Sequence, residues 1–297
     1  MAESTSLINL GELSKPATTL IEKISDAVGG IFRPYQTRRM AEAEADAAIT
    51  KAQGEIQITA LQQRALHRFL VEEGQKQENI ENIARKALPF VSEEATPENV
   101  ENDWIANFFD KSRLISDEEM QTLWAKVLAG EANKPGSYSK RTLNLLASMD
   151  KGDAELFKRF CSYIWHIGRL VPLILEEDHS VYKKAGITFE SLQHLDSIGL
   201  IHFDPMAGFA QTFRIKPEVT TDKVDFTIAY YGKPHKVTLP RSGDQTQIAI
   251  GKATLTTPGI QLAIVAGSIP DEEFRAFILE RWKEPYSIVP MSIEVQN

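Results

Sequence analysis

Histidine and cysteine side chains are the groups in this sequence best suited to metal binding, nucleophilic attack or proton transfer. The six histidines show no metal-ligand spacing such as H-E-x-x-H, and His194 has only Asp196 and Asp204 near it, at positions typical of a surface or turn. Cys161 follows Phe160 in an apolar helical stretch, which favours a small buried hydrophobe. We therefore predict no metal site and no catalytic residue. The six histidines are His67, His166, His179, His194, His202 and His235.

The segment GKAT, residues 251–254, is similar to the end of a phosphate-binding loop, whose backbone N–H groups cradle the phosphates of a nucleotide. The full motif requires Gly at position 246 and Ser or Thr at position 253, but the chain has Thr246 and Ala253 there. The G-x-S-x-G pattern of serine hydrolases does not occur. The motifs therefore predict no bound cofactor and no enzyme activity.

The stretch DEEMQTLWAKVLAGE, residues 117–131, has the clearest helical pattern. Apolar residues recur at i, i+3, i+4, i+7 and i+8 from Met120, which predicts one buried face. Ser116 and Glu119 have the spacing of a capping box, and Gly130 is expected to end the helix. Trp124 is interpreted as a core anchor. The predicted core is Trp104, Phe108, Met120, Leu123, Trp124, Val127 and Leu128.

These elements predict a mainly α protein with a small α/β module at its end. We expect an amphipathic N-terminal segment at 1–35, a long helical arm at 36–95, a helical bundle at 96–166 and a module at 167–297. The module reads as a helix, a stop at Gly199, a strand, a hairpin around Gly232-Lys233 and a helix after Thr257. This order resembles a winged helix.

The arm is rich in Ala, Glu and Gln, with one long helix predicted from about 35 to 74 and another apolar stripe at 80–91. Its first half has few large apolar residues, so propensity alone gives it marginal stability in water. Two interpretations stay open, a solvated arm and a helix that packs against another subunit. We predict a homo-oligomer, and a partner protein is also expected.

Residues 17–32 form an amphipathic segment beside basic residues, a combination that favours contact with an anionic membrane surface. The alternative is that the same face packs against the protein body. The predicted contact residues are Leu20, Ile21, Ile24, Val28, Ile31, Phe32, Arg38 and Arg39.

Composition narrows the class of protein. The chain has 297 residues, a net charge of -8 and one cysteine, which together fit a cytoplasmic protein without disulfides. No secretory signal and no apolar run long enough to cross a membrane occur in the sequence, so localisation is expected in the cytoplasm, peripheral to the inner membrane. Residues 155–216 carry seven basic and seven acidic side chains, so nucleic acid is not an expected partner.

The sequences SDEEMQTLWAKVLAGE and SKRTLNLLASMD resemble the helical core of the bacterial domain-of-unknown-function family 2806. A more distant resemblance links them to the abortive-infection alpha family. The later elements L..L...GLI and LTTPG..L are similar too, so the resemblance covers about residues 90–270, with Trp124 and Ala125 its sharpest points. It implies a bacterial or phage-borne origin and a link to phage defence, and it implies no catalytic residues.

We therefore predict a non-enzymatic, oligomerising interaction protein in bacterial antiphage defence of the abortive-infection type, with peripheral membrane contact. The first alternative is a nucleic-acid-linked regulator that uses the winged-helix-like module. The second is an enzyme whose motif is not recognisable in the sequence.

Overall fold

The computed structural model describes residues 13–28, 59–216, 218, 221–284 and 286–291 of the chain. They form an α-rich fold with antiparallel sheets, which confirms the predicted class at this level. The chain divides into two compact units, residues 1–147 and 148–297.

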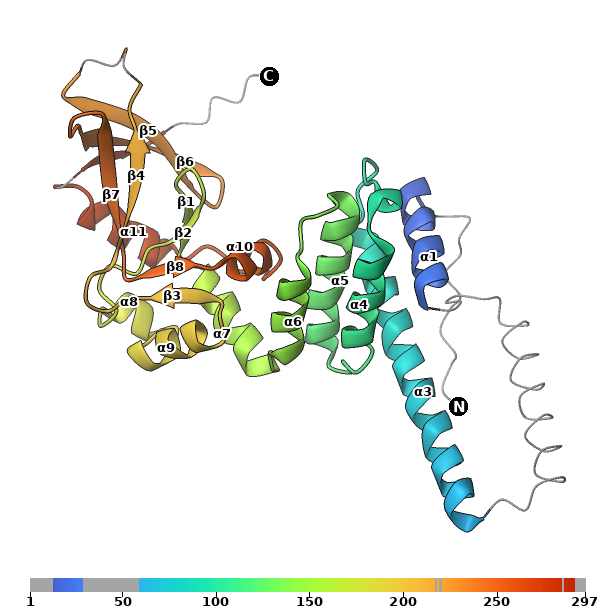
Figure 1. The fold of residues 1–297 in the computed structure, drawn as a ribbon. Helices are drawn as coiled ribbons and strands as arrows, with labels where there is room; N and C mark the ends of the chain where they lie inside the picture. The colour runs from blue at the N-terminus through green and yellow to red at the C-terminus, as the bar shows by residue number, and fades with distance from the viewer. Residues whose placement is uncertain (1–12, 29–58, 217, 219–220, 285, 292–297) are drawn as a thin grey trace. The chain divides into compact units, whose positions relative to one another are not determined.

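The first unit is helical (Figure 1). Its helix α3 packs against α4 and α5, and α1 packs against α4 and the short 3-10 helix η3. The elements are α1 (Lys15–Val28), α3 (Ala60–Ala87), η2 (Leu88–Phe90), η3 (Pro97–Asn99), α4 (Asn102–Ser112), α5 (Glu118–Asn133) and α6 (Lys140–Ser148).

Aromatic rings fill the centre of this unit. Trp124 is fully buried, and its ring meets Phe108 edge-on at 5.1 Å between centroids. Trp104 stacks on Phe108 at 5.3 Å between centroids, and its indole N–H donates to the backbone oxygen of Tyr138 at 2.7 Å. Of the predicted core, Leu123 alone is half-buried and the others are buried. Burial of such rings supplies large apolar area to the core.

Both predicted ends of α5 are wrong. Asp117 is the N-cap instead of Ser116, because its carboxylate accepts from the backbone N–H groups of Glu119 and Met120 at 3.0 Å each. Gly130 lies inside the helix, which continues to Asn133. A Cβ at Gly130 would lie only 2.7 Å from the Tyr138 ring, so this glycine serves a close approach and not a helix stop.

The arm also differs from its prediction. One continuous helix, α3, replaces the expected break between residue 74 and the stripe at 80–91, and it begins with a capping box formed by Thr59 and Gln62. The second half of α3 packs on α5. The domain boundary predicted between residues 95 and 96 therefore falls between elements that share one core. The predicted helical segment at 36–58 lies outside the described residues.

The second unit combines helices with short strands. A five-stranded sheet has the order β2-β1-β5-β6-β9, and β3 pairs with β8 and β4 with β7, all antiparallel. Its helices are α7 (Lys151–Cys161), α8 (Ser180–Lys183), α9 (Phe189–Ser197), α10 (Thr257–Ala263) and α11 (Glu272–Arg281). Its strands are β1 (Ile164–His166), β2 (Leu170–Pro172), β3 (Ile201–Phe203), β4 (Phe209–Arg214), β5 (Lys223–Tyr230), β6 (Lys233–Pro240), β7 (Gln245–Gly251), β8 (Ala253–Leu255) and β9 (Ser287–Pro290).

Helix α7 was assigned to the bundle from sequence, but it belongs to this second unit. It contacts α9 and α10, and the Tyr230 hydroxyl donates to the backbone oxygen of Ser162 just after the helix at 2.7 Å. An amphipathic helix pattern shows that one face is buried but not which neighbour buries it.

The predicted order of helix, Gly199 stop and strand is present as α9, Gly199 at φ 85° and β3. The hairpin is also present, but its turn is Tyr231-Gly232, one residue earlier than predicted. Thr256 caps α10 by accepting from the backbone N–H of Gly259 at 3.0 Å.

Candidate interaction surface

The cysteine and the histidines other than His67, which lies on α3, are dispersed over the second unit. His194 on α9 bonds Asp153 on α7 at 2.6 Å instead of the two acids near it in sequence, and the His194 side chain is half exposed while that of Asp153 is largely covered. Burial raises the pKa of the Cys161 thiol well above its ordinary value, so the thiol stays protonated at neutral pH. Within the described ranges, no three His, Cys, Asp or Glu side chains form a group that could hold a metal ion.

The GKAT segment forms a structural junction. Gly251 has φ 93° and packs so tightly that a Cβ would lie 2.1 Å from the backbone oxygen of Ile174. The next residue, Lys252, donates its backbone N–H to that oxygen at 2.8 Å and its ammonium to Glu177 at 2.6 Å. Gly251 therefore allows the backbone of Ile174 to approach closely, and Lys252 is held in an ion pair with Glu177.

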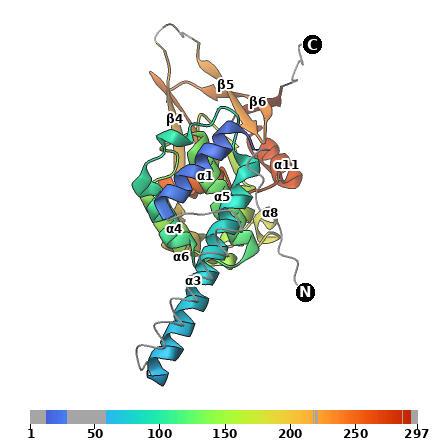
Figure 2. The same cartoon turned by 90° about the vertical axis from the view of Figure 1, so that its right-hand side faces the viewer.

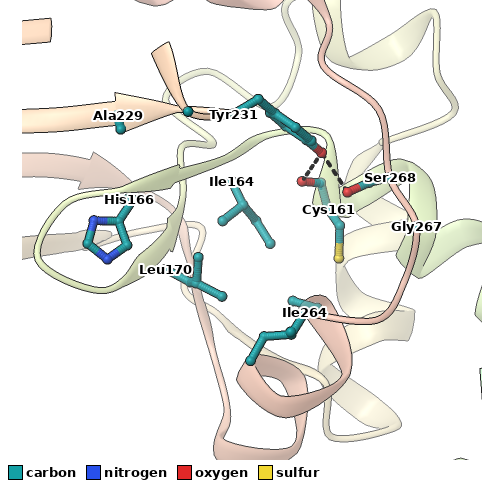
Figure 3. A pocket seen from close by; sticks show the side chains of 11 residues that line it. Cys161, Ile164, His166, Leu170, Ala229, Tyr231, Ile264, Gly267 and Ser268 are labelled. Atoms are coloured by element: carbon teal, nitrogen blue, oxygen red, sulfur yellow. Dashed lines mark hydrogen bonds between the residues drawn. The ribbon is translucent and has the colours of Figure 1, made fainter. Parts of the chain in front are cut away.

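A pocket of about 400 Å³ opens beside the turn of the β5-β6 hairpin (Figure 3). Its walls are mostly apolar, with Ile164 and Leu170 from β1 and β2 and Ile264 at the C-terminal end of α10. The Tyr231 hydroxyl is held there by the Ser268 hydroxyl at 2.5 Å and by the backbone oxygen of Cys161 at 3.3 Å (Figure 3). The pocket therefore offers a bound molecule apolar contact and hydrogen bonds, and the thiol of Cys161 beside it is protonated.

Tyr231 has a left-handed backbone, at φ 44°, which is uncommon for a bulky residue. The two-residue turn requires this conformation, and Asn or Gly normally supplies it. Here the T-shaped contact of the Tyr231 ring with Tyr230 at 4.9 Å and the two hydroxyl bonds offset the strain. The sequence pattern of the hairpin contained no signal for this residue.

The predicted membrane-contact face of α1 is covered by protein. Leu20, Ile21 and Ile24 are buried, and Val28 is half-buried. The Lys23 ammonium also binds the backbone oxygens of Glu98, at 2.8 Å, and of Val100. For these residues the structure agrees with the alternative interpretation from the sequence, in which the apolar face packs against the protein body. Ile31, Phe32, Arg38 and Arg39 lie outside the described residues.

Helix α3 carries the largest group of exposed apolar side chains among those described. Leu61, Phe69 and Val71 are each more than half exposed, and Leu70 is 49% exposed. In both views the first half of α3 runs clear of α4, α5 and α6 (Figures 1 and 2). Large apolar groups gathered in this way mark an interaction site more often than scattered ones do.

Part of this apolar surface extends the buried face of the same helix. Eighteen residues make five helical turns, so residues with this spacing point the same way. Leu66 thus points the same way as Ala84, and Phe69 the same way as Ala87, and both alanines are fully buried in the body. Leu66 and Phe69 therefore continue, on the projecting half of α3 before Asn79, the direction that is buried from Asn79 onward, whereas Leu70 and Val71 point away from it.

The comparison with family models matches residues 63–279 to the family described as "Protein of unknown function (DUF2806)". This chain belongs to the DUF2806 family. The DUF2806 match includes Phe69 and Leu70 on the projecting half of α3, and it ends within α11. Curated proteins and solved structures gave no match to the chain.

The DUF2806 region also contains both elements that the sequence resemblance singled out after α7. They meet in the fold, because the Thr256 hydroxyl donates to the backbone oxygen of Gly199 at 2.7 Å. Helix α1 lies outside the matched residues. Among helices in the described ranges, none combines the length and apolar composition needed to cross a membrane.

Proposed function

We propose that this protein is a non-enzymatic interaction protein that self-associates through α3 and acts in bacterial antiphage defence of the abortive-infection type. The observation that carries the self-association is the group of exposed apolar side chains on the first half of α3, with Leu61 68% and Phe69 57% exposed. Leaving these side chains in water costs about 25 cal/mol for each Å² of apolar surface that a partner would cover. Association removes that cost.

The defence role is supported by sequence alone. The stretch around Trp124 and Ala125 resembles the abortive-infection alpha family, and this resemblance implies a link to phage defence. We also propose a cytoplasmic protein, in keeping with its single cysteine. Peripheral contact with the inner membrane is proposed only for a state in which α1 has left its packed position, because Ile24 is fully buried there.

The self-association is tested by light scattering of the full chain at micromolar concentration. The wild type is expected to exceed the mass of one chain, and Leu61→Gln/Phe69→Gln is expected to approach it. Met206→Gln is the matched control, since Met206 is an exposed apolar residue, at 92%, in the other unit. A monomeric wild type, or a double variant with unchanged mass, contradicts the proposal.

The defence role is tested by plating phages on a bacterial host with and without the gene. Protection by the wild type and its loss with Leu61→Gln/Phe69→Gln would support the combined proposal. Equal protection by the wild type and the double variant, with the variant monomeric, would separate defence from self-association. An unprotected wild-type host across a broad phage panel would contradict the defence role.

A further inference from the structure

We propose that the pocket beside the β5-β6 hairpin binds a small neutral molecule that has an apolar body and one hydrogen-bonding group. The pocket lies within the second unit, so this inference goes beyond the proposed self-association through α3 and does not depend on it. Its volume of about 400 Å³ lies near the lower end of the range for small-molecule sites in proteins. That size suits a compact aromatic or short acyl group.

The apolar walls select the body of the ligand. Ile164, Leu170 and Ala229 come from β1, β2 and β5, which are neighbours in the sheet. Ile264 lies opposite Ile164 and Leu170, at the end of α10, and is 69% exposed (Figure 3). A ligand seated between the sheet and Ile264 would cover apolar surface on both sides, and this burial favours binding.

One end of the pocket is polar, because the hydroxyls of Tyr231 and Ser268 lie 2.5 Å apart there (Figure 3). Each hydroxyl carries one proton and can also accept a hydrogen bond. When Tyr231 donates to Ser268, the Ser268 proton is available to a ligand acceptor. When Ser268 donates to Tyr231 and Tyr231 donates to the backbone oxygen of Cys161, at 3.3 Å, the Ser268 oxygen is available to a ligand donor. The pair therefore suits a ligand hydroxyl, amide or ring N–H.

The charge of the pocket excludes an ionised ligand. Among the described residues that line it there is no Asp, Glu, Lys or Arg, and His166 is exposed. Burial raises the pKa of the Cys161 thiol and of the Tyr231 hydroxyl, so both groups are uncharged at neutral pH. An ion in this pocket would lose its water without gaining an oppositely charged partner, which is costly. The ligand is therefore neutral.

The backbone of Tyr231 supports a binding role for its side chain. A two-residue hairpin turn of this kind normally takes Asn or Gly, whereas Tyr231 adopts φ 44° at a conformational cost. Tyr231 is 38% exposed, so core packing alone does not account for a tyrosine at this position. Strained residues of this kind cluster at ligand-binding and catalytic sites. Here the strained residue supplies the hydroxyl at the polar end of the pocket.

Three probes with a shared ring system test the class of ligand. Indole has one N–H donor, N-methylindole lacks it, and indoleacetate adds a negative charge. Saturation-transfer NMR titrations of the full chain measure each dissociation constant. Indole is expected to bind saturably, and N-methylindole roughly two- to tenfold more weakly because one hydrogen bond is lost. Indoleacetate is expected to bind roughly tenfold or more weakly than indole, because its charge has no partner. Indoleacetate that binds as tightly as indole would overturn the neutral class.

Two variants locate the binding in this pocket. Ala229→Phe adds a ring from β5 that occupies the pocket and is expected to abolish indole binding. Thr227→Phe adds the same ring two residues earlier on the same face of β5, outside the lining, and is the matched control. Ser268→Ala is expected to weaken indole by roughly two- to tenfold and to leave N-methylindole unchanged. Circular dichroism verifies that each variant keeps its fold.

The outcomes separate the pocket from the hydroxyl pair. A folded wild type without saturable indole binding, or a folded Ala229→Phe that binds indole as the wild type does, would overturn the site. An unchanged ratio between indole and N-methylindole in Ser268→Ala would overturn the role of the hydroxyls. That ratio also decides the case if Ala229→Phe does not fold. Light scattering of the wild type reports on α3 separately, so failure of either proposal leaves the other standing.

Discussion

The hydroxyl of Thr256 donates to the backbone oxygen of Gly199 at 2.7 Å, although 57 residues separate the two in sequence. The backbone N–H of Thr256 also reaches the oxygen of Leu200 at 3.1 Å. The next turn brings Gly259 so close that a Cβ would lie 1.9 Å from the same Leu200 oxygen. The end of α9, the start of β3 and the cap of α10 are therefore one joint.

Gly259→Ala is expected to destabilise the second unit. The added methyl group meets backbone and not a movable side chain, so the joint must open, at a cost of about 1–3 kcal/mol or more. Urea denaturation followed by tryptophan fluorescence measures the change in the free energy of unfolding. Thr256→Ser, which keeps the hydroxyl, is the control and is expected to stay near wild type. A Gly259→Ala variant that unfolds at the same urea concentration as the wild type would contradict the tight packing of Gly259 against Leu200.

Gly74→Ala is expected to stabilise α3. Gly74 lies inside this helix, and a Cβ there would meet nothing within 4 Å. Alanine is favoured over glycine in a helix interior by about 1 kcal/mol. The helical signal in circular dichroism and the thermal midpoint are both expected to rise. A loss of helix would show that α3 breaks at residue 74, as the sequence pattern alone indicated.

The outcome for α3 illustrates what the sequence could and could not predict. Periodic apolar residues correctly indicated a helix on each side of Gly74, but glycine is also a common helix stop, and local patterns do not separate the two roles. Packing of Ile80 and Ile83 on the body stabilises the helix across this position. The same limit explains Gly130, whose partner Tyr138 becomes adjacent only in the fold.

The candidate surface was predictable in part. The shortage of large apolar residues in the arm indicated that it needs neighbours, and the structure leaves Leu61 and Phe69 exposed on it. The left-handed Tyr231 and the pocket beside it were not predictable, because they depend on α10 meeting the hairpin turn. Likewise, amphipathicity showed that α1 has an apolar face without showing whether protein or lipid covers it.

Glu131 is expected to make stability depend on pH. Its side chain is buried, and its carboxylate accepts from the backbone N–H groups of Gly136 at 2.6 Å and Tyr138 at 2.8 Å. Burial outweighs these bonds and raises the pKa of Glu131 above 4.5. As pH rises from 4.5 to the folded pKa, the unfolded chain loses this proton first. The contribution of Glu131 to stability therefore falls across that interval.

Glu131→Gln removes this titration. The unfolding free energy of the wild type minus that of the variant is expected to fall as pH rises through the interval above 4.5. Urea denaturation at several pH values between 4 and 7 measures the difference, and Glu98→Gln, an exposed change in the same unit, provides the control. A difference that grows with pH would mean that the hydrogen bonds to the carboxylate lower the pKa of Glu131 by more than burial raises it.

The last prediction concerns α1, because Ile24 cannot be buried against the protein body and contact a membrane at the same time. Ile24 is fully buried against the body, and Lys23 is tied to the backbone of Glu98 and Val100. Ile24→Asp places a carboxylate in that apolar position, and burying an unpaired charge is among the largest destabilising changes. We therefore expect the variant to unfold at markedly lower urea concentration. Thr19→Asp adds the same charge on the opposite side of α1 and is expected to stay near wild type.

Sedimentation with anionic phospholipid vesicles distinguishes the two roles of this face. With α1 packed, Leu20, Ile21 and Ile24 are covered by protein, so the wild type is expected to remain in the supernatant. Conditional membrane contact would require α1 to detach, and each basic residue near the surface, such as Lys15 or Lys23, would then add about 1 kcal/mol of attraction. A wild type that pellets with vesicles, together with a folded Ile24→Asp that does not, would contradict the packed state and favour a membrane-contact helix.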